Sequence, residues 1–466
     1  MKNINLLSKT INRNGEKKMP IFRAYDIRGI YPTQINEEFA FKIGEAFGTF
    51  NPGKIIIGND ARLSGPSLKQ QLIKGLVSTG CDVIDVGMVA TPIIIFSTKH
   101  LKCDGGIMIT ASHNPKEFNG FKFNDANAIP ISYESGINEI QKIFNSEKFS
   151  EGEGSVVKKN IIEEYSNFLL SKINITKSVD MKIVVDVGNA SPGLIYPKVL
   201  KKIGIDVYEL YCEPDGNFPN HQPDPSKKEN MIDLQKKVLE VKADLGFAYD
   251  GDGDRLGVVD EDGKIVEPNQ IFALLIKQVL DKKPNSKIVY DALSSMMIED
   301  VIKKNNGIPV VSKVGHTYIT QRMVKENAIL AGELSGHYYF EEIFNSDDAL
   351  FASLRLLEFL TKSGKKLKDH FKDLPKYYSQ VSEGMRIPIK ESEKFSFIKN
   401  LKEELRNKGY NIDTLDGVKI MFDDGWALLR PTHTESKISV AYESRSEQGF
   451  KRIKEFVEKI VERIPR

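Results

Sequence analysis

The sequence "FAYDGDGDRLGVVD", from Phe247 to Asp260, places a loop of acidic residues and glycines between two apolar runs. Leu245–Tyr249 and Leu256–Val259 are short, apolar and bounded by turn residues, which is typical of buried strands. The motif is therefore predicted to join two strands of a sheet.

The loop itself carries Asp250, Asp252 and Asp254, separated by single glycines. Glycine permits a tight, irregular loop, so the three carboxylates can turn toward one point. Clustered carboxylates repel one another unless a cation compensates their charge, and hard oxygen ligands select Mg²⁺ or a similar ion. A magnesium site is the favoured interpretation of this loop.

Two other interpretations of the loop stay open. A calcium-binding EF-hand also spaces acids at alternate positions, and Glu261 falls at its last ligand position, but Arg255 stands where glycine is required. A solvated acidic turn would explain neither the paired glycines nor the apolar runs on both sides.

Short strand-like runs alternate with helical patterns through most of the chain, which is typical of α/β domains. Ser67–Ser78 and Ala349–Leu360 are predicted helices. Three successive α/β units predict a tandem architecture without an exact sequence repeat, and from Val381 an antiparallel sheet and an amphipathic helix follow. The other predicted strands are Lys54–Gly58, Val83–Val86, Gly106–Ala111, Lys182–Val187, Lys287–Tyr290, Ile308–Ser312, Val418–Phe422, Ala427–Leu429 and Lys437–Tyr442.

The composition of the 466-residue chain is that of a soluble globular protein. Its 66 basic residues nearly balance 64 acidic ones, so nucleic acid is not an expected partner. No apolar run approaches the roughly 18 residues that cross a bilayer, and no membrane partner is expected. Residues 1–18 are predicted to be a polar tail, with Met19 as an alternative start. Cys81, Cys103 and Cys212 are expected to be buried, reduced thiols of a cytoplasmic protein.

A second segment, "GIMITASHNP" from Gly106 to Pro115, runs from a predicted strand into a serine. An ordinary turn explains it about as well as a functional serine, because Ser-x-Asn-Pro is a good turn sequence. A triad hydrolase would prefer Gly-x-Ser-x-Gly, which is absent. With Lys122 close by and a divalent cation in the same protein, Ser112 suits phosphoryl transfer, in which positive charge near the transferring group supplies most of the catalysis.

Two further loops are interpreted as structural. "GNDARLSGPS", with Arg62, Ser64 and Ser67, is predicted to be a helix-capping turn that supports the site. "DGNFPNHQPDP", residues Asp215–Pro225, is rich in proline and is predicted to be a rigid wall or an interdomain contact.

Five motifs together resemble those of the α-D-phosphohexomutase family, most closely its phosphomannomutase/phosphoglucomutase members, over nearly everything from Met19 to the C-terminus. The resemblance implies three related α/β domains and a smaller C-terminal α+β domain around a central cleft. The motifs are "FRAYDIRG" (Phe22–Gly29), "TASHNP" (Thr110–Pro115), "DGDGDR" (Asp250–Arg255), "GELSGH" (Gly332–His337) and "RPTHTESK" (Arg430–Lys437). The expected domains are residues 19–155 (phosphoserine loop), 156–267 (metal-binding loop), 268–375 (sugar-recognition loop) and 376–466 (phosphate-binding loop).

The resemblance implies an enzyme that rests with a phosphoryl group on Ser112. It donates this group to a mannose or glucose 1- or 6-phosphate, and the other phosphate of the resulting hexose 1,6-bisphosphate returns to the serine. Phosphoserine and substrate bring roughly four negative charges together, at ~1.5 to 2 per phosphate. Mg²⁺ bound to the three aspartates would complete its shell with Ser112.

The implied catalytic residues are Ser112, Lys122, Arg28 and His113. Lys122 and Arg28 match the family's basic pair for general acid/base work, and Lys122 is favoured because arginine rarely releases its proton. His113 and Arg255 are expected to orient the phosphoserine, with simple loop structure as the alternative.

Sugar recognition is assigned by resemblance to Glu333 and Ser335, which can hydrogen-bond sugar hydroxyls. His337 either contacts the ligand or packs behind its loop. Arg430 is expected to grip the phosphate that is not transferred, as a bidentate fork. The whole implied substrate-binding set is Tyr25, Arg255, His316, Glu333, Ser335, His337, Arg430, Thr432, His433 and Thr434.

Two alternatives to this function stay open at the level of sequence. Phosphoglucosamine mutases are the nearest rivals, although they tend to carry glutamine where this chain has Leu334. A non-catalytic sugar-phosphate or metal-binding protein is the second, although mere binding needs neither Ser112 nor Lys122. Small sugar phosphates are the expected partners, and the chain is expected to be a monomer or a weak homo-oligomer.

Overall fold

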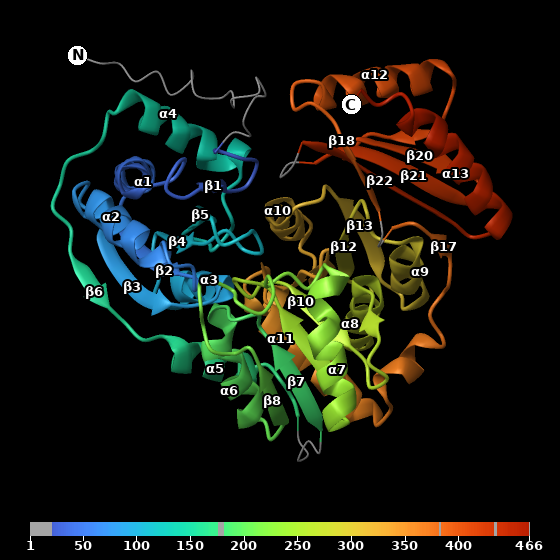
Figure 1. The fold of residues 1–466 in the computed structure, drawn as a ribbon, viewed down its shortest axis with the longest axis horizontal. Helices are drawn as coiled ribbons and strands as arrows, with labels where there is room; N and C mark the ends of the chain where they lie inside the picture. Colours follow the sequence, from blue (N-terminus) through green and yellow to red (C-terminus); the bar gives the residue numbers. More distant parts are fainter. Residues whose placement is uncertain (1–20, 176–180, 382–383, 433–435, 466) are drawn as a thin grey trace.

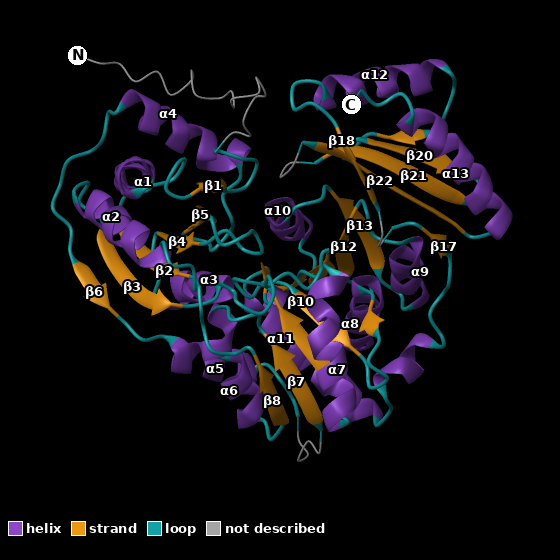
Figure 2. Ribbon diagram, in the orientation of Figure 1, coloured by secondary structure: helices purple, strands orange, loops and turns teal. Residues whose placement is uncertain are grey.

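The computed structural model describes residues 21–175, 181–381, 384–432 and 436–465. Four mixed α/β units follow one another along an arc, with the N-terminal and C-terminal units at its two ends (Figure 1; Figure 2). The α/β fold class, with three related units and a smaller fourth one, is confirmed. The predicted tail, residues 1–18, lies outside the described residues.

The first unit is built on a six-stranded sheet in the order β1-β5-β4-β2-β3-β6. Strands β4, β2, β3 and β6 run parallel. At the other edge, β5 pairs antiparallel with β4, and β1 pairs antiparallel with β5. Its strands are β1 (Ile27–Ile30), β2 (Lys54–Asn59), β3 (Asp82–Met88), β4 (Gly105–Ile109), β5 (Phe118–Asp125) and β6 (Val156–Lys158), and its helices are α1 (Glu37–Phe50), α2 (Gly65–Val77), α3 (Thr91–His100) and α4 (Asn138–Ser146).

The second unit has a five-stranded sheet in the order β11-β10-β9-β7-β8, with β9, β7 and β8 parallel. The expected boundary after residue 155 places β6 in this unit, whereas β6 pairs with β3 of the first sheet. Its elements are β7 (Lys182–Asp186), β8 (Asp206–Leu210), β9 (Leu245–Tyr249), β10 (Leu256–Val259), β11 (Ile265–Val266), α5 (Ile162–Ser171), α6 (Tyr196–Lys202) and α7 (Ile232–Val241).

The third unit repeats this plan with the order β13-β12-β14-β15-β16. Strands β13, β12 and β14 are parallel, and β15 and β16 are antiparallel. Its elements are α8 (Pro268–Lys282), β12 (Lys287–Asp291), α9 (Met296–Lys304), β13 (Ile308–Ser312), α10 (His316–Glu326), β14 (Leu330–Gly332), β15 (Tyr338–Phe340), β16 (Ser346–Asp347) and α11 (Ala349–Ser363).

The fourth unit is an antiparallel sheet covered by α12 and α13. Its central strands β22, β21 and β20 match the predicted sheet, and the amphipathic C-terminal helix is present. The elements are β17 (Tyr378–Ser379), β18 (Met385–Pro388), α12 (Lys394–Asn407), β19 (Ile412–Asp413), β20 (Val418–Phe422), β21 (Gly425–Pro431), β22 (Lys437–Ser444) and α13 (Glu447–Val461).

The first three sheets share a topology that no sequence repeat reveals. In each, the first of the parallel strands lies between the second and the third, and the third continues through a hairpin into an antiparallel strand. Three equivalent hairpin loops therefore follow β4, β9 and β14, at residues 110–117, 250–255 and 333–337. Each contains one of the predicted functional motifs.

The clusters of buried apolar side chains do not coincide with the four sheets. One continuous apolar cluster runs through the first three units, from Ile56 to Leu374. The fourth unit has a separate core around Val418, Leu429 and Ile453. The cysteines Cys81, Cys103 and Cys212 are buried and unpaired, as predicted. Among the described residues, no helix is both long and apolar enough to cross a membrane.

Candidate active site

The three equivalent hairpin loops converge, because the carboxyl ends of parallel strands lie at one edge of each sheet. The Ser112 Oγ donates a hydrogen bond to Asp250 Oδ2 at 2.8 Å, which joins the first loop to the second. His337 Nε2 lies 3.3 Å from Asp254 Oδ1, which joins the third loop to the second. The predicted serine, metal and sugar motifs therefore form one site.

Ser112 is held in an unusual backbone conformation at the centre of this site. Its φ of 50° lies in the left-handed region, which costs a non-glycine residue of order 1–3 kcal/mol. The strand before it ends at Ile109, two residues earlier than predicted. The hydroxyl is buried and also lies 3.1 Å from His113 Nδ1. Burial, followed by the positive charge of Arg255, lowers the pKa of His113 well below its usual value, so this imidazole is neutral.

Arg62 braces the serine loop from behind. Its side chain is 1% exposed, and Nη2 donates to the carbonyl of Ser112 at 2.7 Å. The other acceptors in the loop are the carbonyls of Asn114 at 2.6 Å, Pro115 at 2.7 Å and Phe118 at 2.9 Å. One guanidinium thus fixes four carbonyls of the loop that carries the nucleophile.

The capping role predicted for this segment is only partly correct. Ser64 does precede α2, but its side chain makes no capping bond and instead accepts from Asn119 Nδ2 at 2.8 Å. Asp60 Oδ2 accepts from Arg62 Nε at 3.1 Å and from Thr110 Oγ1 at 2.6 Å. Thr110 Oγ1 in turn accepts from the backbone N–H of Ser112 at 2.8 Å, so the segment supports the serine from both sides.

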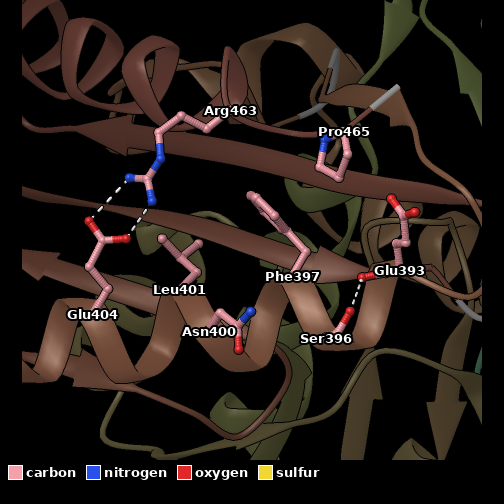
Figure 3. A pocket seen from close by; sticks show the side chains of 8 residues that line it. All are labelled: Glu393, Ser396, Phe397, Asn400, Leu401, Glu404, Arg463 and Pro465. Atoms are coloured by element: carbon pink, nitrogen blue, oxygen red, sulfur yellow. Dashed lines mark hydrogen bonds and ion pairs between the residues drawn. The ribbon is translucent and has the colours of Figure 1, made fainter.

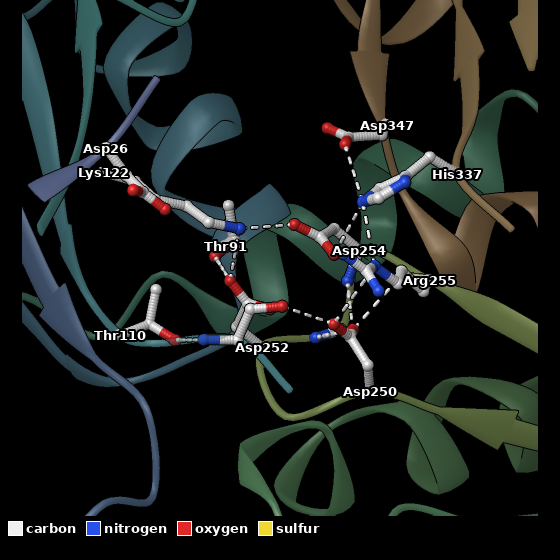
Figure 4. A network of polar contacts seen from close by, with 12 residues as sticks. Asp26, Thr91, Thr110, Lys122, Asp250, Asp252, Asp254, Arg255, His337 and Asp347 are labelled. Carbon is white, nitrogen blue, oxygen red and sulfur yellow. Dashed lines mark hydrogen bonds and ion pairs between the residues drawn. The ribbon is translucent and has the colours of Figure 1, made fainter. Parts of the chain in front are cut away.

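The three aspartates of the second loop bring carboxylate oxygens within 4.8 Å of one another (Figure 4). Asp250 Oδ1 accepts from the backbone N–H groups of Gly253, Asp254 and Arg255, at 3.0, 3.1 and 3.2 Å. Burial, then the charges of Asp254 and Asp252, raises the pKa of Asp250 well above its usual value. Asp252 Oδ1 is buried without a hydrogen-bond partner in the described part of the chain. An acid cluster with an unsatisfied inward oxygen fits a hard divalent cation.

Lys122 lies against this cluster, on β5. Its Nζ donates to Asp252 Oδ2 at 2.7 Å and to Asp254 Oδ2 at 2.6 Å (Figure 4). Burial alone would lower the pKa of Lys122, but the two carboxylates outweigh it and raise the pKa above its usual value. In this arrangement the lysine is an ammonium group.

Arg28 approaches the serine loop from β1. Its Nη1 donates to Asn114 Oδ1 and its Nη2 to Asp26 Oδ2, both at 2.5 Å. Asp26 is buried, and the positive charges of Arg28 and Arg23 overcome burial and keep its pKa below the usual value. Arg28 therefore contacts the same loop as Arg62.

In the sugar loop, Glu333 and His337 are both buried and bonded. Glu333 accepts from the hydroxyl of Tyr339 and, at 3.2 Å, from the backbone N–H of Gly315. His337 Nδ1 lies 2.7 Å from Ser335 Oγ. Burial would lower the pKa of His337, but the negative charge of Asp254 outweighs burial and raises this pKa above its usual value. The acid cluster therefore favours the protonated imidazole. The structure places it inside the site and not behind the loop.

His316 and Tyr25 form a contact between the third and first units. Their rings meet edge to face with centroids 5.0 Å apart. Burial lowers the pKa of His316 to about 3, so its imidazole is neutral. Burial and then Asp26 raise the pKa of Tyr25, and the positive charge of Arg430 opposes this from the fourth unit. All four units therefore contribute side chains to one region.

Arg430 ends β21 and is 5% exposed. Its Nε donates to Asp416 Oδ2 at 2.9 Å. The hydroxyl of Thr432, expected to bind phosphate, donates to the carbonyl of Lys437 at 3.2 Å. His433 and Thr434 lie outside the described residues.

Two other segments have clear surroundings. In the loop Asp215–Pro225, the side chain of Gln222 donates to the carbonyl of His113, which agrees with a supporting wall. Leu293 packs with Leu334 against the cluster that contains Trp426.

A surface depression of about 390 Å³ lies between α12 and the C-terminus, in the fourth unit (Figure 3). Glu404 and Arg463 form a bidentate ion pair at its edge. No predicted site residue lines it.

Several contributing residues were missed by sequence reasoning. Thr91, at the start of α3, donates its N–H to the carbonyl of Asp252 at 2.8 Å and its hydroxyl to Asp252 Oδ2 at 2.6 Å. Asp347 Oδ2 lies 3.9 Å from His337 Nε2. Asp26 stands inside a quoted motif, but nothing in the sequence pairs it with Arg28. Thr-Pro before an apolar helix predicts only a helix start.

Comparison with known proteins agrees with this geometry. Four family models match in succession: phosphoglucomutase/phosphomannomutase alpha/beta/alpha domain I over residues 19–151, domain II over 163–263, domain III over 267–378 and the C-terminal domain over 380–460.

Individual relatives match over almost the whole chain. A phosphomannomutase/phosphoglucomutase from Pseudomonas aeruginosa is 39% identical over 443 residues, covering 93% of this chain and 94% of the relative. A phosphoglucomutase from Neisseria gonorrhoeae is 36% identical over 454 residues, covering 96% and 97%. The crystal structure of a phosphoglucomutase/phosphomannomutase family protein from Burkholderia thailandensis superposes with a TM-score of 0.87 at 32% identity, covering 95% of this chain and 96% of the other.

Proposed function

The chain belongs to the phosphoglucomutase/phosphomannomutase family, and on that premise we propose how this protein interconverts hexose 6-phosphates and hexose 1-phosphates. It is an isomerase that acts on sugar phosphates, and the comparisons do not favour phosphoglucosamine or a purely binding role. The observation that carries the proposal is the Ser112 hydroxyl, buried and hydrogen-bonded to an acid cluster that fits a divalent cation. Mannose and glucose phosphates are the proposed substrates, and the cytoplasm is the proposed location.

Ser112 is the proposed phosphate carrier. In the first half-reaction the bond between phosphorus and Ser112 Oγ breaks, a bond to the free O1 or O6 of the hexose phosphate forms, and the proton of that sugar hydroxyl is passed on so that Ser112 Oγ becomes a hydroxyl. In the second half-reaction the other phosphate of the hexose 1,6-bisphosphate passes to Ser112 Oγ, and the proton that this hydroxyl loses is passed to the released sugar oxygen. Arg62, Asp60 and Thr110 hold the serine backbone, so the oxygen is preorganised for in-line transfer.

Asp250, Asp252 and Asp254 are proposed to hold Mg²⁺ together with Ser112. When bound, the ion would supply positive charge next to the transferring group, which is the main catalytic requirement of phosphoryl transfer. Asp250 is also bonded to three backbone N–H groups, so the loop keeps its shape through this residue.

Lys122 and Arg28 are proposed to serve the proton transfers and the charge balance. Lys122 carries its proton in the observed arrangement, which suits donation to the departing oxygen. His113, which is neutral, and Arg255 are proposed to orient the phosphoserine. Arg28 donates to Asn114 in the serine loop, which supports the proposal that Arg28 is a second cation for the same phosphate.

Substrate positioning is proposed to involve the third and fourth units. Glu333 and Ser335 would bind the sugar hydroxyls, with His337, His316 and Tyr25 around them. Arg430, with Thr432 and with His433 and Thr434 of the same sequence motif, would hold the phosphate that is not transferred. We propose that the chain works as a monomer or weak homo-oligomer, with domains at residues 19–155, 156–267, 268–375 and 376–466.

A substrate panel tests this function. Mannose 1-phosphate, glucose 1-phosphate and glucosamine 6-phosphate are assayed with and without Mg²⁺, with catalytic glucose 1,6-bisphosphate as activator. Conversion of the mannose and glucose compounds that requires Mg²⁺ supports the proposal. Turnover of the amino sugar alone contradicts the substrate assignment, and no turnover of any compound contradicts the enzymatic function.

A further inference from the structure

The phosphate anchor Arg430 is fixed from one side by a carboxylate that the function above does not use. Asp416 lies in the turn before β20 and is 9% exposed. Its Oδ2 accepts from Arg430 Nε at 2.9 Å and, with the same oxygen, from the backbone N–H of Val314 at 2.9 Å. Arg430 belongs to the fourth unit and Val314 to the third, so one oxygen joins the two units.

The turn is shaped to bring Asp416 against Arg430. Gly417 has a φ of +82°, and a Cβ atom there would lie 2.7 Å from Arg430 Cα and 2.4 Å from the carbonyl oxygen of Leu429. Only glycine permits this approach without a shift of the backbone. Asp416 and Gly417 therefore form a turn built on the backbone of the phosphate anchor.

The other end of the connection is the sugar-recognition region. Val314 N–H binds Asp416, and the next N–H along the chain, that of Gly315, donates to Glu333 Oε2 at 3.2 Å. His316 follows directly and begins α10. Of two successive backbone N–H groups, one thus donates to Asp416, which lies beside Arg430, and the next donates to Glu333, which is proposed to bind the sugar.

We propose that Asp416 is a positioning residue that orients Arg430 and joins it to the Val314–His316 loop, so that the phosphate anchor and the sugar-binding loop are set together. The proposal rests on the proposed function, because it assumes that Arg430 grips the phosphate of a hexose phosphate. Asp416 does not touch the reacting atoms.

Two substitutions separate position from charge. Asp416→Ala removes the acceptor, so Arg430 loses its orientation and the fourth unit loses this bond to Val314. Asp416→Asn keeps an oxygen that can accept from both donors while removing the negative charge next to Arg430. If Asp416 acts by orienting Arg430, only the alanine variant should bind phosphate more weakly. If Asp416 acts only through its negative charge, both variants should bind phosphate more tightly, because both remove that charge from beside Arg430.

The kinetic test compares both variants with Asp300→Ala. Asp300 also joins the two units, through Arg445 at 2.8 and 3.1 Å, but lies away from Arg430. We expect Asp416→Ala to raise KM for glucose 1-phosphate about 10-fold, the scale of one hydrogen bond to a charged group, with kcat nearly unchanged. Asp416→Asn and Asp300→Ala should leave KM within about 3-fold of wild type, within the spread of near-neutral changes.

A binding measurement makes the result independent of turnover. Inorganic phosphate is titrated calorimetrically into the full-length wild type, Asp416→Ala, Asp416→Asn and Arg430→Lys proteins, after thermal melting has shown that each is folded. Weaker binding in the alanine and lysine variants, with wild-type binding in the asparagine variant, supports the proposal. Equal binding by wild type and Asp416→Ala, or equal losses in Asp416→Ala and Asp416→Asn, overturns it. Absence of mutase activity in a wild type that shows the predicted phosphate pattern would instead count against the proposed function alone.

Discussion

The first three units and the fourth unit are attached to the site in different ways. One apolar cluster runs through the first three units and includes a residue of each strand that leads into the loops of Ser112, Asp250 and Glu333, namely Met108, Tyr249 and Leu330. The first unit has a second cluster on the other face of its sheet. The fourth unit has its own core and meets the third through a small cluster around Ala292 and Trp426. Polar contacts such as that of Asp416 with Val314 supplement this small contact.

This difference separates two tasks of the proposed reaction. Phosphoryl transfer needs preorganised charges, which suits loops fixed by a shared core. Gripping and releasing a substrate phosphate requires no such continuity, and domains joined by small interfaces are able to move relative to one another. Changes near Ser112 and the acid cluster should therefore alter kcat, and changes near Arg430 should alter KM.

The largest effect is expected from the metal loop. Asp252→Asn removes a hard ligand and a partner of Lys122, while Asp250 still holds the loop through three backbone bonds. We expect kcat to fall by about 10³-fold, the several kcal/mol that a bound metal ion contributes to such reactions. Steady-state assays across a Mg²⁺ series measure the loss.

Asp260→Asn is the matched control, since Asp260 is a buried turn residue at the far end of β10 that bonds Asp262 and Lys264 N–H groups. It should retain wild-type kcat to within a few fold, as expected for a side chain remote from the chemistry. If Asp252→Asn kept wild-type kcat and Mg²⁺ dependence, the acid cluster would not be the metal site.

The fourth unit should respond in KM. Arg430→Lys replaces a planar fork by a single ammonium, which cannot form two parallel bonds to a phosphate. Loss of one charge-assisted hydrogen bond, about 1.5–3 kcal/mol, corresponds to an increase in KM of about 10- to 100-fold. Saturation kinetics with glucose 1-phosphate should show kcat nearly preserved. A fall in kcat with an unchanged KM would remove the distinction between the two regions.

Arg62 offers a smaller test within the rigid part. In Arg62→Lys one ammonium replaces the donors to four carbonyls, of which that of Ser112 is buried, and a buried group left unsatisfied costs about 1–3 kcal/mol before relaxation. We expect a lower melting temperature and a decrease in kcat of about 10-fold, the size of one such loss. Arg452→Lys, at an exposed arginine paired with Asp424, is the control and should change neither quantity measurably.

The smallest effect is expected at the surface depression of the fourth unit. Hydrogen bonds from Arg463 and then Lys408 lower the pKa of Glu404 to about 2, below its ordinary 4.5. Because the folded-state pKa is the lower one, the pair stabilises the protein above pH 4.5 and this contribution is lost as the pH falls toward 2. The side chain is partly solvated, so the contribution is less than about 1 kcal/mol.

Urea unfolding of wild type and Glu404→Gln between pH 7 and pH 3 checks this sign. The difference in unfolding free energy should be small at pH 7 and shrink further as the pH falls, with kcat and KM unchanged throughout. A difference that grew toward low pH would show that the carboxylate is not stabilised as an anion.

Local patterns were sufficient to predict the acidic loop and many of the strands, but not β1, β5, β8 or β14. Leu245–Tyr249 and Val418–Phe422 have the predicted bounds because alternation of apolar runs with glycine-rich turns is a local signal. The motif loops could also be identified, since their glycines and carboxylates lie within a few residues of one another. That three such loops follow equivalent strands emerged only from the sheet topology.

Contacts between segments far apart in the chain could not be predicted from the sequence. The bonds of Arg62 to the serine loop span about 50 residues and that of Thr91 to Asp252 spans 161, and no short-range pattern encodes either pair. Arg62 was interpreted from its neighbours Ser64 and Ser67 as part of a capping turn, because local preference was the only information available. The boundary predicted after residue 155 separates β6 from its partner β3, because that pairing joins segments about 70 residues apart, for which no short-range pattern exists.

A single-turnover phosphate balance tests the central claim most directly. Enzyme phosphorylated on Ser112 is mixed with a slight excess of glucose 1-phosphate and Mg²⁺, quenched over time, and analysed by intact-mass spectrometry together with the sugar products. The account predicts that at every time point the phosphate lost from the protein equals the glucose 1,6-bisphosphate formed, that the protein regains phosphate as glucose 6-phosphate appears, and that Ser112→Ala protein forms no bisphosphate. Isomerisation by Ser112→Ala at the wild-type rate, or by a wild type that never carries phosphate, would contradict it.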